Sequence, residues 1–283
     1  MILSMAVFGT VGIFVRYISL PSGVISGVRG LIGAAFLFAV MVISGKRPSI
    51  SRMKGHGLVL ILSGIMIGAN WICLFEAYRY TTVATATLCY YLQPVFVTLA
   101  SPFIFHEKLN PKKVLCVFAA LCGIVLISWK DVGEGSVTGI ALGIGAAVLY
   151  AAVVMMNKSI PDVEAYDRTF VQLLSAGIVM IPYTLLCESF ENVTVTAVGL
   201  VLLLILSVFH TGVCYSLYFG AIPYLSLQTF AILGFIDPVV AIILSSVIFR
   251  EDPGITGVIG AVLILGAAFI SEVSFDRKKK NGV

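Results

Sequence analysis

Residues 85–107, TATLCYYLQPVFVTLASPFIFHE, and residues 229–251, TFAILGFIDPVVAIILSSVIFRE, follow one pattern at an offset of 144 residues. Aligning the two stretches places Gln93 and Pro94 opposite Asp237 and Pro238. Further identical residues then coincide: Tyr80 with Tyr224, Thr85 with Thr229, Ser101 with Ser245, Phe105 with Phe249, and Glu107 with Glu251. The chain is therefore predicted to consist of two related halves.

The composition excludes an ordinary soluble domain. The 283 residues are 59% hydrophobic and 11% charged, with a mean hydropathy of +1.07. Soluble domains carry charges on roughly a quarter of their residues. The apolar runs are continuous and do not alternate with period two, so they predict membrane helices and not a barrel.

Ten apolar runs approach the length of about 20 residues that a membrane-spanning helix needs. The predicted spans are 1–18, 24–44, 57–77, 83–105, 114–129, 139–157, 169–188, 197–220, 225–249 and 254–271. Five spans in the first copy turn the second copy upside down in the membrane. The predicted fold class is an all-α membrane protein of ten transmembrane helices in two inverted five-helix repeats. The repeats are residues 1–133 and 134–283, the second with a short basic tail.

Positive charges orient this topology. Of the 18 basic residues, thirteen lie on the cytoplasmic side if the N-terminus is cytoplasmic. They are Lys46, Arg47, Arg52, Lys54, Lys108, Lys112, Lys113, Lys158, Arg168, Arg277, Lys278, Lys279 and Lys280. The positive-inside rule then predicts that both termini are cytoplasmic. Aligning Phe8 with Tyr150 pairs Arg16 with Lys158 near opposite membrane faces, as inverted copies require. The first helix starts about six residues later than its counterpart, so the chain is expected to begin inside the membrane edge.

Asp237 is the most informative polar residue, because a central charge costs about 2.5–3.5 kcal/mol on insertion scales. It lies twelve residues from either end of its predicted span, about 18 Å at 1.5 Å per residue. Its carboxylate suits a proton carrier or a counter-ion for a substrate amine. Alternatively, it caps a helix that starts with Pro238. Gln93 and Pro94 occupy the equivalent place, and paired interruptions of this kind point to a transporter's binding site. Structural kinks at Pro94 and Pro238 are the alternative.

Other polar or aromatic residues lie well inside their spans, where they could line a cavity for a partly apolar organic solute. They are Asn70, Trp71, Tyr90, Tyr91, His210 and Tyr215. Aromatic packing between helices explains the rings equally well. His210 is a second candidate for proton coupling, with a structural histidine as the alternative.

Charges near the helix ends have simpler explanations. Arg29 either extends to the membrane surface or binds a substrate carboxylate in an outer vestibule. Glu76 and Arg79, three residues apart, are predicted to form an ion pair. Glu107 and Glu251 are predicted to be boundary anchors and not site residues. Glycines spaced as GxxxG, at 64 and 68 and at 139 and 143, predict close helix packing.

Six cysteines lie inside apolar runs without a CxxC motif or a nearby histidine cluster. They are interpreted as packing residues, and neither a metal nor a cofactor site is predicted. The chain contains no GxSxG or HExxH motif and no phosphate-binding loop, which argues against a membrane enzyme and against ATP-driven pumping by this chain alone.

Residues 84–95, ATATLCYYLQPV, followed by Glu107 and Gly123, resemble the EamA-type members of the drug/metabolite transporter superfamily. The second half repeats the pattern with Pro238, Glu251, Gly260 and Gly266. The resemblance implies a two-repeat bundle with a central cavity in the bacterial inner (plasma) membrane, and often export of amino acids, metabolites or toxic compounds. Importers exist among such proteins too. The first helix lacks the carboxylate on which the small four-helix relatives rely, so Asp237 would have to substitute.

The predicted function is therefore secondary active transport, as an exporter, of a small organic solute such as an amino acid, an amine or a related metabolite, by alternating access with proton coupling. A channel-like facilitator with the same cavity is the alternative. The expected partners are the solute, protons and the lipid bilayer, without nucleic acid, and a homodimer is left open.

Overall fold

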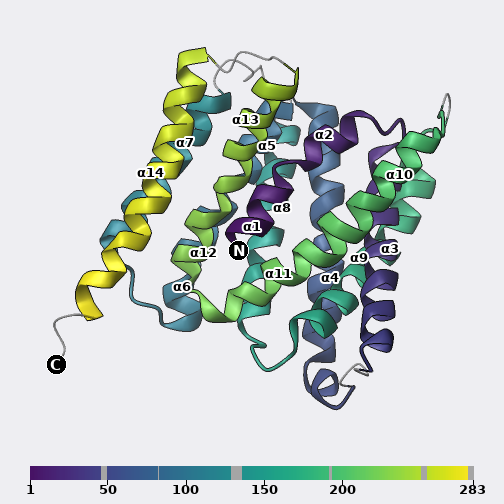
Figure 1. Cartoon of the computed structure of the whole chain (residues 1–283), viewed down its shortest axis with the longest axis horizontal. Helices are drawn as coiled ribbons and strands as arrows, with labels where there is room; N and C mark the ends of the chain where they lie inside the picture. The colour runs from purple at the N-terminus through teal and green to yellow at the C-terminus, as the bar shows by residue number, and fades with distance from the viewer. Residues whose placement is uncertain (46–49, 82, 129–135, 191–192, 250–253, 280–283) are drawn as a thin grey trace.

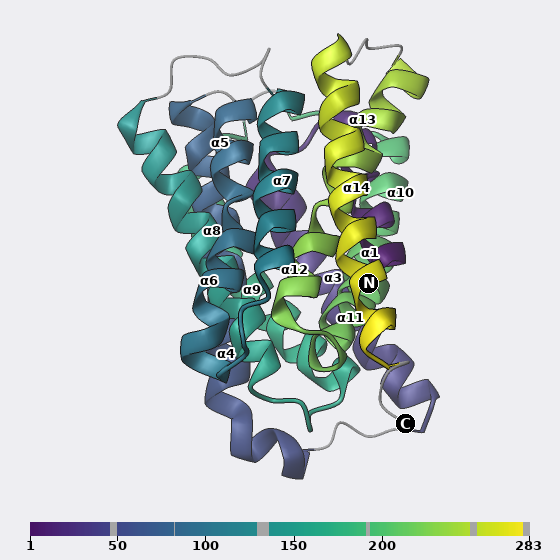
Figure 2. The same ribbon diagram turned by 90° about the vertical axis from the view of Figure 1, so that its left-hand side faces the viewer.

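The computed structural model describes residues 1–45, 50–81, 83–128, 136–190, 193–249 and 254–279, and every regular element among them is helical (Figures 1 and 2). Large apolar side chains cover much of its outside, with Phe103 and Leu186 each 83% exposed. Seven of the described helical segments are long and apolar enough to cross a membrane, and residues 2–15 and 254–270 form shorter apolar helices. The chain is a multi-pass membrane protein.

Seven helices lie in the described part of the first half of the chain. They are α1 (Ile2–Phe8), α2 (Val11–Arg16), α3 (Ser22–Ile43), α4 (Ile50–Tyr80), α5 (Val83–Tyr90), α6 (Gln93–Phe105) and α7 (Pro111–Ser128). The segment predicted as one helix, 83–105, is thus divided between α5 and α6. The divide directly precedes Pro94, whose ring removes a backbone donor.

Among the described residues, the second half contains seven α-helices and two other helical segments. They are α8 (Val137–Lys158), α9 (Ala165–Cys187), α10 (Ala197–Ile205), the π-helix η1 (Leu206–Val213), α11 (Cys214–Ala221), the 3-10 turn η2 (Ile222–Tyr224), α12 (Leu227–Gly234), α13 (Ile236–Phe249) and α14 (Gly254–Lys279). The predicted segment 225–249 is divided at Phe235, just before Asp237 and Pro238. The boundary between the predicted halves and Glu251 lie outside the described residues, as do the side chains of Ser245 and Phe249.

The predicted first span, 1–18, is two short helices and not one. The break falls at Gly9 and Thr10, where the chain passes directly against α13. A Cβ on Gly9 would lie 2.6 Å from the carbonyl oxygen of Asp237 and 2.8 Å from Cβ of Val240. Figures 1 and 2 both place the N-terminus at mid-height of the bundle. The close approach of α1 and α13 brings this short helix to the molecular centre.

Small residues bring the long helices together. Helix α3 packs along α9, α4 along α8 and α9, and α7 along α14. At the crossing of α3 and α9, a Cβ on Gly30 would lie 3.0 Å from Cα of Gly177. Both members of the pair Gly64 and Gly68 face α9. The close packing that the GxxxG spacing predicts is therefore present at Gly64 and Gly68.

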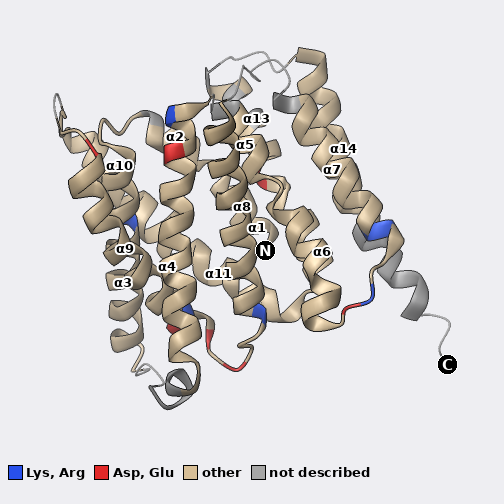
Figure 3. Ribbon diagram, turned by 180° about the vertical axis from the view of Figure 1, so that it is seen from behind, with Lys and Arg blue, Asp and Glu red and all other residues tan. Residues whose placement is uncertain are grey.

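Charged residues lie mainly at helix ends (Figure 3). The predicted ion pair between Arg79 and Glu76 is present at 3.0 Å, and Arg79 also contacts Glu188 at 3.3 Å. Glu188 accepts a hydrogen bond from the backbone N–H of Gly23 at 2.9 Å, and Tyr183 donates one to Glu76 at 2.8 Å. We call this group of five residues the Glu188 clasp. It fastens α3, α4 and α9 to one another at one end of the bundle.

Candidate functional site

A cavity of about 200 Å³ lies where the breaks between α5 and α6 and between α12 and α13 meet α1, α3, α8 and α11. Six of the residues predicted from the sequence line it: Tyr90, Tyr91, Gln93, Pro94, Tyr215 and Asp237. Of the other seven lining residues, the sequence singled out only Arg29 as a candidate binding residue, and for an outer vestibule. The remaining six are Met5, Phe8, Val11, Tyr150, Tyr218 and Gly234. The structure thus brings the two helix breaks to one place.

Asp237 is the second residue of α13, which places its carboxylate in the first turn of that helix. The partial positive charge of a helix N-terminus favours an anion there. Among the described residues, none of the ion pairs involves Asp237. Gln93 begins α6 and is buried. An acid and an amide therefore face the cavity from equivalent breaks.

Arg29 supplies the opposite charge to the same cavity. Its Nε donates a hydrogen bond to Oγ1 of Thr211 at 3.0 Å, and Thr211 donates to the carbonyl oxygen of Leu206 at 2.9 Å. That second bond reaches back five residues because η1 is a π-helix, a form that is frequent at functional sites. The wide turn of η1 thus places the Thr211 hydroxyl where it can accept the hydrogen bond from Arg29. From the sequence, Arg29 was predicted either to extend to the membrane surface or to bind a substrate carboxylate in an outer vestibule; the structure places it at the central cavity.

Tyrosine rings form much of the cavity wall. Tyr150 stacks on Tyr218 with ring centroids 6.3 Å apart and lies 6.0 Å from Tyr90. Phe8 packs edge-on against Tyr215 at 5.2 Å. Such rings combine apolar area with hydroxyl groups that can form hydrogen bonds. The wall therefore suits a solute with both apolar and polar parts.

Three predicted residues, Asn70, Trp71 and His210, do not belong to the lining of this cavity. Nδ2 of Asn70 donates to the carbonyl oxygen of Ala146 at 2.7 Å, which joins α4 to α8. Trp71 is buried in the hydrophobic cluster that contains Tyr215, and the two side chains are hydrogen-bonded. Asn70 and Trp71 therefore contribute to the packing of the helices around the cavity and not to its lining.

His210 is buried in η1, with its Nε2 2.7 Å from Oγ1 of Thr10. The Thr10 hydroxyl also lies 2.7 Å from the carbonyl oxygen of Val7, so it bonds within its own helix break as well as to His210. The ring also packs edge-on against Phe14 at 4.8 Å. These contacts tie η1 to the break between α1 and α2.

A second hollow, of about 310 Å³, lies between α13 and α14. Its lining is aliphatic apart from glycine and Ser246, and it contains no charged group. Within the described ranges, no three His, Cys, Asp or Glu side chains gather as a metal site would require. The tyrosine-walled cavity is therefore the candidate site.

Comparison with known proteins places this architecture among membrane transporters. The sequence pattern of the EamA-like transporter family matches residues 1–129 and again residues 137–272. The chain is similar to the uncharacterized transporter YxxF of Bacillus subtilis (strain 168), with 30% identity over 96% of this chain and 88% of the relative. It is 24% identical to protein RarD of Salmonella typhi over 87% of this chain and 84% of that protein. One solved crystal structure has the same fold, with a TM-score of 0.86 at 18% identity over 96% of this chain and 95% of the other.

Proposed function

Because the chain belongs to the EamA-like transporter family, we propose that it is a secondary active transporter that moves a small zwitterionic or amine-bearing solute by alternating access. Export out of a bacterial cell is the proposed direction, and the bacterial inner membrane the proposed location, with both termini in the cytoplasm. One observation carries the choice of solute: Arg29 and Asp237, of opposite charge, line one tyrosine-walled cavity.

Ten membrane crossings in two inverted repeats, residues 1–133 and 134–283, are part of the proposal. The family pattern matches the chain twice, once in each half, which supports two repeats. The seven candidate spans, together with the pair α1 and α2, α7 and α14, supply ten crossings. Five crossings per copy invert the second copy relative to the first.

The size and chemistry of the cavity limit the solute. A volume of about 200 Å³ is smaller than the roughly 300–1,000 Å³ of sites for drug-sized ligands. Asp237 is the proposed counter-ion for an amine, and Arg29 the proposed partner for a carboxylate, which it can bind through two parallel hydrogen bonds. Tyr90 and Tyr215 also line the cavity, and a tyrosine side chain offers a solute both apolar area and a hydroxyl group. An amino acid or a similar metabolite satisfies all three features.

Proton coupling follows from the position of Asp237. A lone carboxylate in an apolar interior is unfavourable and takes up a proton or a cation. In the proposed cycle, Asp237 is ionised while it holds the substrate amine and protonated on the return without substrate. One proton then moves opposite to each solute molecule.

A thermal stability screen of amino acids and amines on the purified protein identifies the solute, because a ligand that binds only the folded state raises its stability. Flux of the best ligand is then measured in proteoliposomes with an imposed proton gradient. Saturable accumulation against the solute gradient is expected. Flux that does not saturate, without accumulation, would instead establish the channel-like facilitator.

A further inference from the structure

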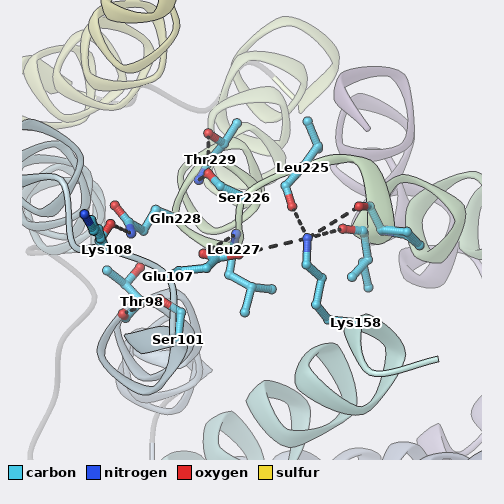
Figure 4. Close-up of polar contacts among 12 residues, drawn as sticks. Thr98, Ser101, Glu107, Lys108, Lys158, Leu225, Ser226, Leu227, Gln228 and Thr229 are labelled. Carbon is cyan, nitrogen blue, oxygen red and sulfur yellow. Dashed lines mark hydrogen bonds and ion pairs between the residues drawn. The ribbon is translucent and has the colours of Figure 1, made fainter. Parts of the chain in front are cut away.

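One lysine and one glutamate, drawn in Figure 4, join the ends of several cavity-lining helices. The lysine, Lys158, lies before the start of α9, whereas Glu188 of the clasp follows its end. Nζ of Lys158, at the C-terminus of α8, donates to the carbonyl oxygen of Leu225 at 2.6 Å and lies 4.0 Å from Oε1 of Glu107. The other carboxylate oxygen of Glu107 accepts the backbone N–H of Leu227 at 3.2 Å. We call these four residues the Lys158 bridge.

The bridge crosses between the two halves of the chain. Glu107 follows α6 of the first half, whereas Lys158, Leu225 and Leu227 belong to the second half. Further bonds reinforce the contact around α12: the amide of Gln228 donates to the carbonyl oxygen of Lys108, and Nζ of Lys113 donates to Oγ1 of Thr229 at 2.6 Å. By contrast, the Glu188 clasp joins α3, α4 and α9, of which only α3 supplies a lining residue of the cavity.

The bridge lies beyond the end of the cavity that faces the C-terminus of α8. Tyr150 of the wall precedes Lys158 by eight residues of α8, about 12 Å at 1.5 Å per residue. Between them, Tyr218 packs against Tyr150 and against Phe230, with centroids 6.3 and 4.8 Å apart. Four lining segments thus have their far ends held together by the bridge, since α6, α8, α11 with η2, and α12 all end or begin there.

The chemistry of the bridge allows it to separate. Lys158 and Glu107 are partly exposed, with side-chain exposures of 18% and 21%, so water can replace their mutual contact. An ion pair of this kind adds little net stability. On α6, between bridge and cavity, the hydroxyl of Thr98 is buried and has no hydrogen-bond partner in the described part of the chain. A buried hydroxyl without a partner is unfavourable, and it gains a partner if this segment is hydrated in another state.

We propose that Lys158 and Glu107 form the gate that closes the central cavity towards the α8 C-terminal end. This inference rests on the proposed alternating-access function. The gate opens when Lys158 leaves the Leu225 carbonyl and Glu107 leaves the start of α12. The sequence aligns Arg16 with Lys158 and Glu251 with Glu107, but their side chains lie outside the described part, and the gate is assigned from Lys158 and Glu107 alone.

Ser101 provides a reporter of the gate. It lies on α6 between the cavity and Glu107, is fully buried, and donates to the carbonyl oxygen of Thr98 at 3.0 Å (Figure 4). In a background with all six native cysteines replaced by alanine, Ser101→Cys is labelled with a water-soluble maleimide. Labelling is expected to rise about tenfold or more in Lys158→Met and in Glu107→Gln, as a tenfold larger open population would produce.

The control is a pair of substitutions in the clasp, Arg79→Met and Glu188→Gln, which is expected to leave labelling of the Ser101→Cys thiol at the parent rate. Parent-rate labelling in both gate variants, with unchanged melting temperatures, would overturn the proposal. If Lys158→Met does not fold, Lys158→Arg is used, because it retains the charge but not the geometry of the bridge. The assay uses no solute, so the gate can fail this test while transport is still demonstrated.

A cross-link tests the same gate in the opposite direction. In the cysteine-free background, Glu107→Cys and Lys158→Cys together are joined by a short reducible bis-maleimide. Flux in proteoliposomes is expected to stop on cross-linking and to return on reduction. Full flux through the cross-linked protein would overturn the gate without affecting the assignment of the chain as a transporter.

Discussion

Gly9 lies directly against Asp237: a Cβ at position 9 would come within 2.6 Å of the Asp237 carbonyl oxygen. The contact is with backbone of α13, which cannot move aside as a flexible side chain can. The helix break between α1 and α2 therefore helps to fix the position of Asp237, the one acidic group among the described residues that line the cavity.

Gly9→Ala is expected to destabilise the protein by about 1–3 kcal/mol, the usual effect of overpacking, and to weaken solute binding because Asp237 shifts. Thermal unfolding in detergent and the solute concentration for half-maximal flux measure the two effects. The matched control is Gly12→Ala, since a Cβ there meets nothing within 4 Å. Equal behaviour of the two variants would contradict the close contact.

Asp237→Asn keeps the size of the side chain but removes its charge and its exchangeable acidic proton. A hydrogen bond to a charged group contributes about 1.5–3 kcal/mol, so affinity for an amine-bearing solute is expected to fall by roughly 10- to 150-fold. Accumulation driven by a proton gradient is expected to disappear. Calorimetric binding and proteoliposome flux check the two parts. Proton-driven accumulation that persists in Asp237→Asn would exclude this carboxylate as the coupling group.

Arg29→Met tests recognition of a substrate carboxylate. Affinity for a zwitterionic solute is expected to fall by about tenfold or more, the usual loss for a charge-assisted contact, whereas affinity for the same solute without its carboxylate is unchanged. Thr211→Val, which removes the acceptor for Nε of Arg29, is expected to act in the same direction and more weakly. If Arg29→Met lowers the affinity for the zwitterion and for the amine by the same factor, Arg29 does not bind the carboxylate.

Arg168 is expected to be essential for stability. It is 1% exposed, and its guanidinium donates to the carbonyl oxygens of Asn157 at 3.0 Å and Phe219 at 2.8 Å. Arg168→Met leaves these carbonyls without their donor, at about 1–3 kcal/mol each. A large fall in the melting temperature is expected, against no change for the exposed Lys112→Met. A melting temperature equal to that of the parent would show that other groups satisfy these carbonyls.

The orientation of the chain is tested with two exposed positions at opposite ends of α9, Asp162 before it and Ser189 after it. In the cysteine-free background, Asp162→Cys is expected to react with a membrane-impermeant maleimide only in inside-out vesicles. Ser189→Cys is expected to react only in right-side-out vesicles. The reverse pattern would place both termini outside the cytoplasm.

The two helix breaks before Pro94 and Pro238, and about half of the cavity lining, could be predicted because they depend on local chemistry. A proline removes a backbone hydrogen bond wherever it occurs, and an acid inside an apolar run is unfavourable wherever it lies. Gln93 and Asp237 were therefore recognisable in the sequence. The EamA-like family membership was likewise predicted and is confirmed by the match to both halves.

The rest of the site depends on tertiary packing. Tyr150 and Tyr218 have the same local sequence character as aromatic packing residues, and only the tertiary fold brings their rings together at the wall of a cavity. Nδ2 of Asn70 and Nε2 of His210 are hydrogen-bonded to Ala146 and Thr10, respectively. No pattern within one helix identifies such partners.

The count of basic residues that oriented the chain shows a similar limit of prediction from sequence. Lys113, Lys158 and Arg168 were counted among the loop charges that set orientation. In the structure, Lys113 and Arg168 are buried, and all three donate hydrogen bonds to helix ends. Basic residues near a helix end can therefore serve as internal caps as well as topological signals.

The Glu188 clasp and the glycine crossing of Gly30 with Gly177 fasten α3 firmly to α9, and α3 carries Arg29. Asp237 belongs to α13, which lies outside that fastened group. Arg29 and Asp237 therefore belong to different groups of packed helices. In the proposed alternating-access cycle, a movement of one group against the other changes the distance between Arg29 and Asp237. The length of a solute, and not only its charge, then decides which movement it stabilises.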